Sequence, residues 1–355
     1  MPSEFLLYGA TGFIGEEMAR AAVAHGLRPL LAGRDAVRVA ALAEELGVEH
    51  RVFPLDDVAG IDEALRTVPA VLHCAGPYLH TAAAMVDGCL RTGTHYLDIS
   101  GELPAYQAMA RRDRDAVARG TMLLPGVGFD VVPTDCLALH LKVRLPTATH
   151  LTLAFHNRGP AAMPPGTLRT GIEMMPFGER VRRDGQLVAP PRQARTRQID
   201  FGEGPVTATR QTWGDVVMAY RSTGIPNIED YAVWADAIRR QLVLATSLRP
   251  IFRFAAVRRL VQRTFKGGST AAQRARTRAS VWGEVRDGAG HRAVSRLHGP
   301  EASVEWTVLA ALAAVKRVVG GDVKPGFQTP ATAYGADFVL QCRGVVREDV
   351  DTSML

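Results

Sequence analysis

The stretch "FLLYGATGFIG", residues 5–15, places strand-like apolar residues directly before three glycines, Gly9, Gly12 and Gly15. A strand that turns sharply into a helix points unpaired backbone N–H groups and the positive end of the helix dipole at the turn, where a phosphate fits. The first glycine then permits the bend, the second a close approach of the backbone to a pyrophosphate, and the third close packing of the helix. This spacing is one residue longer than the common dinucleotide fingerprint. The residues expected at a bound dinucleotide are Gly9, Ala10, Thr11, Gly12, Phe13, Ile14 and Gly15.

A second fragment, "LLAGRD", residues 30–35, carries Arg34 where many dinucleotide-binding chains have an acidic residue. A carboxylate hydrogen-bonds the ribose 2′-hydroxyl of NAD and repels a 2′-phosphate, whereas a guanidinium binds that phosphate. Arg34 therefore favours NADP (as NADPH) over NAD. The alternative is that Arg34 is merely solvated and that Asp35 binds the ribose.

The first third of the chain alternates short apolar runs with helical patterns, which is typical of βαβ units around a parallel sheet. Six strands are expected there, in "EFLLYG", "RPLLAG", "HRVFPL", "AVLHCA", "THYLDI" and "TMLLPG". Six strands are the number in a dinucleotide-binding Rossmann sheet. We therefore predict an α/β protein, a Rossmann doubly wound parallel sheet with a second α+β domain that carries a mainly antiparallel sheet.

From His150 onward the sequence pattern changes to stretches in which polar and apolar residues alternate, which favours antiparallel strands. "ASVWGEVRD" and "HRAVSRLHG" predict a hairpin around "DGAGH", and one long basic helix is expected from about Ala232 to Gln262. A C-terminal helix is expected to begin at Thr329, with Pro330 in its first turn. The expected domains are an NAD(P)-binding Rossmann domain at 1–130, a substrate or dimerisation domain at 131–320, and a helical return to the first domain at 321–355.

Length and composition set the general class of the protein. With 355 residues and 38.3 kDa the chain is long enough for two domains, and 47% hydrophobic with 22% charged residues fits an ordinary folded protein. A formal charge of +6 favours an anionic partner, but no zinc-finger or RNA-binding signature accompanies it, so nucleic acid is not expected. Four scattered cysteines and the lack of a long apolar run predict a cytoplasmic protein with reduced thiols. None of the ten histidines pairs with another at ligand spacing, so no metal is expected.

The segment "HCAGPYLH", residues 73–80, ends the fourth expected strand. Ligands of doubly wound sheets lie outside the carboxyl ends of the strands, so Ala75, Gly76 and Pro77 are expected beside the nicotinamide-side ribose. The alternative is a Gly-Pro turn without a ligand. The segment "THYLDISGE", residues 94–102, reaches the same edge, although Ser100 there also suits a helix cap and Tyr96 also suits packing. The candidate proton donors are Tyr78, His80, Tyr96 and Asp98.

After the sixth expected strand comes "LLPGVGFDVVPTD". Gly126 and Gly128 would again allow a close approach of the backbone. Asp130 and Thr134 are candidates either for the edge where the ligand lies or for capping the next helix.

Taken in order, these segments resemble the saccharopine dehydrogenase-like oxidoreductases, a family that includes mycobacterial trans-acting enoyl reductases and a eukaryotic saccharopine dehydrogenase-like protein. The segments that carry the resemblance are "YGATGFIG", "AGRD", "CAGPY", "GTHYLDISGE", "LPGVGFDVVPTD", "TGIPNIEDY" and "GFQTPATAYG". The resemblance implies an NAD(P)-binding Rossmann domain with the glycine turn and Arg34 on the adenine-phosphate side. After "GPY" such proteins often continue with Tyr-Gly, where this chain has His80 and Thr81. No tyrosine precedes a lysine by four residues, which argues against the mechanism of the short-chain dehydrogenases.

The stretch "RPIFRFAAVRRLVQRTF", residues 249–265, mixes apolar residues with arginines. Such a helix either lies on an anionic membrane or packs its apolar side on a core and shows its arginines to water. The sequence thus favours an NADP-dependent oxidoreductase that acts on a small-molecule, acyl or lipid-linked substrate, with enoyl reduction as one reaction, peripheral membrane contact as one setting and a homodimer as one assembly. The alternative is a non-catalytic nucleotide-binding scaffold or sensor, which the absence of an obvious acid–base pair favours.

Overall fold

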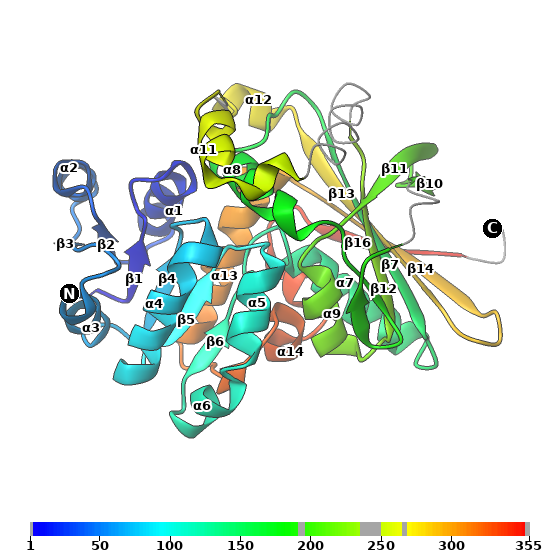
Figure 1. Ribbon diagram of the computed structural model, residues 1–355, viewed down its shortest axis with the longest axis horizontal. Coiled ribbons are helices and arrows are strands. Elements are labelled where there is room, and N and C mark those ends of the chain that lie inside the picture. Colours follow the sequence, from blue (N-terminus) through cyan, green and yellow to red (C-terminus); the bar gives the residue numbers. More distant parts are fainter. Residues whose placement is uncertain (1–2, 191–195, 235–249, 265–267, 352–355) are drawn as a thin grey trace. The chain divides into compact units, whose positions relative to one another are not determined.

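The computed structural model describes residues 3–190, 196–234, 250–264 and 268–351, and it divides into two compact units (Figure 1). Unit 1 comprises Met1–Asp130 and Val304–Ala333, and unit 2 comprises Val131–Ser303 and Tyr334–Leu355. The sequence placed the return of the chain to the first domain at residue 321. In the structure the segment 304–333 already belongs to unit 1, because helix α13 (Thr307–Val319) packs on helix α1 and on two strands of the first sheet.

Unit 1 is built on a parallel sheet with the strand order β15-β6-β5-β4-β1-β2-β3. The order from β3 to β6 is that of a Rossmann fold, in which the direction of winding reverses between β1 and β4. All six predicted strands are confirmed. The short strand β15, which pairs in parallel with β6, was not predicted. The bounds are β1 Phe5–Tyr8, β2 Pro29–Gly33, β3 His50–Val52, β4 Ala70–His73, β5 His95–Asp98, β6 Met122–Leu124 and β15 Gly326–Phe327.

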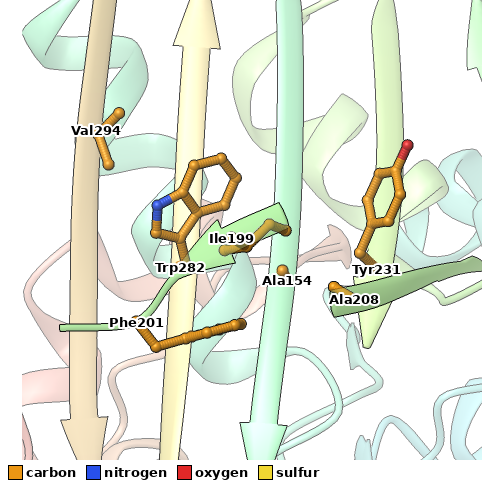
Figure 2. Packing of buried hydrophobic residues seen from close by; sticks show 7 residues of the cluster. All are labelled: Ala154, Ile199, Phe201, Ala208, Tyr231, Trp282 and Val294. Atoms are coloured by element: carbon orange, nitrogen blue, oxygen red, sulfur yellow. The ribbon is translucent and has the colours of Figure 1, made fainter. Parts of the chain in front are cut away.

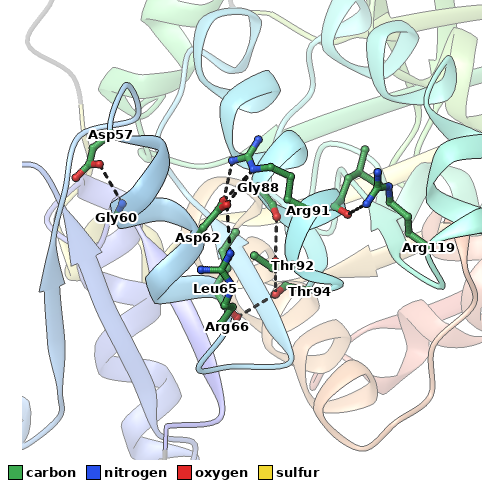
Figure 3. Close-up of polar contacts among 11 residues, drawn as sticks. Asp57, Gly60, Asp62, Leu65, Arg66, Gly88, Arg91, Thr92, Thr94 and Arg119 are labelled. Carbon is green, nitrogen blue, oxygen red and sulfur yellow. Dashed lines mark hydrogen bonds and ion pairs between the residues drawn. The ribbon is translucent and has the colours of Figure 1, made fainter.

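Helices of unit 1 connect these strands as βαβ crossovers, and polar contacts fix neighbouring helices to one another. Arg91 of α4 donates from Nε and Nη2 to the carboxylate of Asp62 on α3 at 2.7–3.1 Å, which holds the pKa of Asp62 below its ordinary value (Figure 3). Gly88 lets the same helices approach, because a Cβ there would lie 2.5 Å from Ile61 Cγ2. The bounds are α1 Phe13–Ala24, α2 Ala36–Leu46, α3 Val58–Leu65, α4 Tyr78–Thr92, α5 Leu103–Ala110, α6 Asp113–Ala118 and α14 Pro330–Tyr334.

Unit 2 contains a sheet that, among the described residues, has nine strands and the central order β10-β11-β12-β7-β13-β14-β16. The described pairs are antiparallel except β12 with β7, so the predicted mainly antiparallel sheet is confirmed. The predicted hairpin is confirmed as β13 paired with β14. The bounds are β7 His150–Arg158, β8 Val181–Arg183, β9 Gln186–Val188, β10 Thr196–Asp200, β11 Pro205–Gln211, β12 Asn227–Ala232, β13 Arg278–Arg286, β14 Arg292–Gly299 and β16 Val346–Val350.

Helix α7 and a buried apolar cluster pack on the second sheet within unit 2. Helix α7 packs so closely on β13 that a Cβ on Gly283 would lie 2.5 Å from Leu141 Cδ1. Thr134 of α7 donates its hydroxyl to Asp215 of α9 at 2.6 Å, so this threonine ties two helices together. Figure 2 shows a buried cluster formed by Ala154, Ile199, Phe201, Ala208, Tyr231, Trp282 and Val294. The helices are α7 Val132–Arg144, α8 Pro165–Met174, α9 Asp215–Thr223, α11 Ala255–Thr264 and α12 Ala271–Ala275, with the short turns η1 Met175–Phe177, η2 Ile251–Arg253, η3 Ala302–Trp306 and η4 Phe338–Gln341.

The prediction of one helix from about Ala232 to Gln262 is wrong. Ala232 ends strand β12, and residues 235–249 lie outside the described residues. Beyond them, the extended backbone of Phe254 (φ −79°, ψ 118°) separates the turn η2 from helix α11. The C-terminal helix does begin where predicted, because Thr329 Oγ1 accepts the N–H of Thr332 at 3.1 Å. Among the described residues, none of the helices combines the length and apolarity that crossing a bilayer requires.

Candidate functional site

The turn between β1 and α1 is compressed against its neighbours in unit 1. Gly9 has a φ of +84°, and a Cβ there would lie 2.9 Å from the backbone nitrogen of Ala75 at the end of β4. A Cβ on Gly15 would lie 2.1 Å from the carbonyl oxygen of Gly9. The N–H of Gly12 donates to the same carbonyl at 3.0 Å. Glycine at these positions is therefore required by the path of the backbone.

The same turn presents the start of α1 to solvent. Gly12 is the N-cap residue and supplies no side-chain hydrogen bond to the first turn of the helix. Thr11 and Ile14 are partly exposed and Gly12 and Phe13 are exposed, whereas Ala10 and Gly15 are buried and shape the turn from within. Uncapped N–H groups at an open helix start favour an anion. These residues fit the pyrophosphate of a dinucleotide, since a side chain at any of the three glycine positions would approach the turn.

The adenosine side of this edge carries two arginines. Arg34 follows β2 and is exposed. Asp35, the alternative ribose ligand, accepts the N–H of Arg38 at 3.1 Å and caps α2, so its carboxylate already has a structural role. Arg38 donates from Nη2 to the carbonyl of Thr11 at 2.6 Å and to Glu16 at 2.8 Å. Sequence reasoning missed Arg38. Arg38 lies in the first turn of α2, four residues after Arg34.

The segment after β4 is fixed by side chains on both sides. Glu102, which is buried, accepts the N–H groups of Tyr78 at 2.8 Å and Leu79 at 2.7 Å at the start of α4. Thr81 donates its hydroxyl to the carbonyl of Ala75 at 2.7 Å. The expected ribose neighbours Ala75, Gly76 and Pro77 lie in this fixed segment, with Gly76 exposed. Their contact with a cofactor stays a prediction.

The predicted proton donors lie in different environments. Tyr78 is buried and donates its hydroxyl to the carbonyl of His73 at 3.1 Å, while Tyr96 is fully buried and donates to Asp98 at 2.7 Å. Burial raises the pKa of both tyrosines well above the ordinary value. His80 is exposed in the first turn of α4. The catalytic role of these residues stays a prediction.

Asp98 is fully buried at the end of β5 and accepts four hydrogen bonds. One carboxylate oxygen accepts from the N–H of Ser100, the hydroxyl of Ser100 and the N–H of Gly126, and the other accepts from Tyr96, all at 2.7–2.9 Å. Burial raises the pKa of Asp98, and these hydrogen bonds oppose the rise. Asp98 therefore joins the ends of β5 and β6. Ser100, which the sequence also suited to a helix cap, donates hydrogen bonds to the Asp98 carboxylate instead.

A second carboxyl at this edge, that of Asp130, has a raised pKa. It lies after β6, beside Gly101, where a Cβ would be 2.8 Å from Asp130 Oδ2. Burial of most of the carboxyl and the nearby charge of Glu102 raise its pKa to about 7, although the residue keeps some exposure. A group with this pKa holds or releases a proton near neutral pH. The sequence offered Asp130 only as an edge or capping residue.

Comparison with known proteins defines the class of unit 1. Residues 5–124 match the family model described as the saccharopine dehydrogenase NADP binding domain. The two-unit fold as a whole is similar to apo saccharopine dehydrogenase (L-Glu forming) from Saccharomyces cerevisiae, with a TM-score of 0.66 and 11% identity over 98% of this chain and 100% of that chain. Residues 5–124 are thus an NADP-binding domain of the saccharopine dehydrogenase type, and the predicted resemblance is confirmed.

Two groups of relatives match part of the chain. A trans-acting enoyl reductase from Mycobacterium leprae is 32% identical over 150 residues, which cover 40% of this chain and 36% of that protein. The saccharopine dehydrogenase-like oxidoreductase of Mus musculus is 28% identical over 163 residues, which cover 40% of this chain and 38% of that protein. The matched region spans well under half the length of these curated relatives.

Proposed function

We propose that the chain is an NADP-dependent oxidoreductase of the saccharopine dehydrogenase-like type, with an acyl or lipid-linked substrate and enoyl reduction as its reaction. The observation that carries the proposal is the compressed glycine turn, in which a Cβ on Gly15 would strike the carbonyl of Gly9. The match of residues 5–124 to an NADP-binding domain supports it. A turn of this kind is built to bring backbone N–H groups to a diphosphate.

The chain's own residues would hold the cofactor from two sides. The exposed N–H groups at the start of α1 would bind the diphosphate, and Arg34 with Arg38 would bind the 2′-phosphate. NADPH, when bound, supplies a hydride, and saturation of an enoyl double bond also consumes one proton. The protein must therefore bring a proton-carrying group to the same edge of the sheet.

Asp130 is the residue best suited to carry that proton. Its pKa of about 7 means that it is partly protonated at neutral pH. The hydroxyl groups of the two tyrosines predicted as proton donors already donate hydrogen bonds within the protein. Tyr78 donates to the carbonyl of His73, and Tyr96 donates to the carboxylate of Asp98. A general acid works best when its pKa is close to the working pH. Asp130 fits this requirement, with exposed His80 as the remaining candidate.

The proposed substrate class rests on the relatives. Trans-acting enoyl reductases from Mycobacterium leprae and Mycobacterium ulcerans match this chain at 32% and 30% identity. Because the matched region covers only 36% of each of those proteins, their activity comes to this chain as a proposal alone.

The test is turnover of NADPH by the full chain with enoyl thioesters of short and long acyl chains, and with keto and imine compounds as alternatives. Oxidation of NADPH with an enoyl thioester is the expected result. The variant Asp130→Asn should bind NADPH as tightly as the wild type and lose about a hundredfold or more in turnover. If the chain binds NADPH and oxidises it with none of these compounds, the non-catalytic scaffold or sensor is the correct description.

A further inference from the structure

A surface of unit 2 exposes large apolar side chains next to arginines. Ile251 is 47% exposed, Phe254 67%, Leu260 64% and Phe177 42%. Ile251 lies on η2, Leu260 on α11 and Phe177 on η1, with Phe254 between η2 and α11, and these elements pack together with α8. A cluster of exposed apolar residues with a charged rim is typical of an interaction site, whereas single exposed apolar residues are ordinary.

Helix α11 is oriented with a polar side toward the protein. Arg258 Nε donates to Glu173 Oε2 of α8 at 2.9 Å, and Gln262 Nε2 donates to Glu173 Oε1 at 2.9 Å. The side chains of Arg258 and Glu173 are only 17% and 11% exposed. A helix that docks to supply a core normally buries its apolar stripe and shows its charges to water. Here the ion pair is the better-covered contact, while Leu260 faces outward.

The outward apolar residues of α11 follow helical spacing. Leu260 lies three residues after Val257 and Val261 lies four residues after it; Leu260 is exposed and the two valines are partly exposed, while the exposed Phe254 lies just before the helix. Residues at this spacing lie along one side of a helix. The alternative in which α11 packs its apolar side on a core is therefore wrong for Phe254 and Leu260.

The charge around this stripe has one sign. Residues 250–264 contain four arginines and no acidic residue. Arg253, Arg259 and Arg263 are exposed, and Arg258 is the one that pairs with Glu173. Three exposed guanidiniums beside an apolar stripe complement an anionic surface that is apolar just beneath its charges.

We propose that this surface, the α11 patch, binds the face of an anionic lipid bilayer. The α11 patch comprises Phe177, Ile251, Arg253, Phe254, Arg259, Leu260 and Arg263. Its apolar side chains would enter the boundary between headgroups and acyl chains, and its arginines would extend to the phosphates. A second copy of this chain fits less well, because a twofold contact through the patch would set arginines against arginines. The proposal is independent of the reaction assigned to unit 1.

The experiment is co-sedimentation of the full chain with phosphatidylcholine vesicles and with vesicles that also contain phosphatidylglycerol. We expect binding to the anionic vesicles alone, and weaker binding as salt is raised. Replacing Arg259 and Arg263 by Gln should lower the partition coefficient by about fivefold for each arginine. The double substitution Phe254→Ser with Leu260→Ser should lower it by about tenfold or more.

A matched control is Val143→Ser, because Val143 on α7 is 70% exposed and lies outside the patch. This variant should bind the anionic vesicles like the wild type, and all variants should keep the wild-type melting temperature because the replaced side chains are exposed. Equal binding to both vesicle types, or binding that the Phe254 and Leu260 substitutions leave unchanged, would overturn the proposal. So would a chain that ignores vesicles while the same substitutions break up a dimer or weaken turnover of long-chain enoyl thioesters.

Discussion

Replacing Gly15 with alanine tests how the phosphate turn is built. The new Cβ would lie 2.1 Å from the carbonyl oxygen of Gly9, and ordinary contact begins at 3.4 Å, so the turn would have to move by 3.4 − 2.1 = 1.3 Å. The atoms in its way are backbone, and both Gly9 and Ala10 donate their N–H groups to the carbonyl of Ala32, at 2.9 and 3.1 Å. The shift therefore strains the attachment of the turn to β2.

Overpacking of this kind costs about 1–3 kcal/mol, and replacing a helical glycine with alanine returns about 0.5–1 kcal/mol. Gly15→Ala should therefore lower the free energy of unfolding by up to about 2.5 kcal/mol. It should also weaken NADPH binding by about tenfold or more, because the N–H groups of the turn move with its backbone. Denaturant unfolding and fluorescence titration with NADPH measure the two effects.

The matched control is Gly171→Ala on α8, which is also a helical glycine but has no atom within 4 Å of its added Cβ. That variant should gain about 0.5–1 kcal/mol in stability and bind NADPH normally. The reasoning fails if Gly15→Ala behaves like Gly171→Ala, since the turn would then have room that the structure does not give it.

Four further substitutions test the site. Arg34→Ala and Arg38→Ala should each weaken NADPH binding by about tenfold, which is the contribution of one charge-assisted hydrogen bond. Calorimetric titration should show that NADH binding is unchanged. Equal losses for both cofactors would contradict the assignment. The folded-state pKa of Asp130, about 7, lies above its ordinary value of 3.8. Between these two values the folded protein keeps a proton that the unfolded chain releases. This carboxyl therefore lowers the stability of the fold increasingly as pH rises from 4 to 7. Asp130→Asn should therefore add up to about 4 kcal/mol of stability above pH 7 and nothing below pH 4, as measured by unfolding across pH, and a pH-independent effect would disprove the shifted pKa. Glu102→Gln should weaken the start of α4 by about 1 kcal/mol and move the alkaline limb of turnover to lower pH, because the Glu102 charge helps to raise the pKa of Asp130; an unmoved limb would show that the two carboxyls do not interact.

The parallel sheet could be predicted from sequence because each strand and its turn are specified locally. Apolar runs of four to six residues alternate with helical patterns in the first third of the chain, and the glycines of the first turn sit at fixed spacing. Strand β15 has no such local signal. It consists of two residues, and it is fixed by Gly326 donating to Thr121 at 2.9 Å and Phe327 donating to Asp113 at 2.7 Å, partners far away in sequence.

The prediction of one long basic helix failed for a related reason. Helical periodicity continues through the stretch around Phe254, and a single residue with extended backbone is enough to separate η2 from α11 without disturbing that pattern. The sequence could not predict which side of α11 faces the protein either, because that depends on a contact with Glu173, which lies on another helix. Amphipathic spacing predicts that a helix has two sides, and the partners decide which side packs.

In the candidate site, the sequence predicted which residue types lie at the edge of the sheet, but not which atoms their side chains contact. Tyr78, Tyr96 and Asp98 have the chemistry of proton donors and lie at the predicted edge. Their hydrogen-bond partners, which the sequence could not supply, give them a structural role as well, and their catalytic role stays a prediction. Arg38 was missed for the same reason. Its place in the sequence suggests a solvent-exposed helix residue, whereas in the structure it donates to the carbonyl of Thr11 in the phosphate turn.

Asp98 and Asp130, two of the carboxyls at this edge, differ in what surrounds them. Burial raises the pKa of both Asp98 and Asp130. Four hydrogen-bond donors around Asp98 stabilise its anion and oppose the rise, whereas Asp130 faces the like charge of Glu102, which adds to it. Proton transfer near neutral pH requires a group whose two protonation states are close in free energy, and donors that bind the anion tightly remove that balance. The hydrogen bonds of Asp98 therefore tie the loops together, and Asp130 is the carboxyl that we propose as the proton carrier.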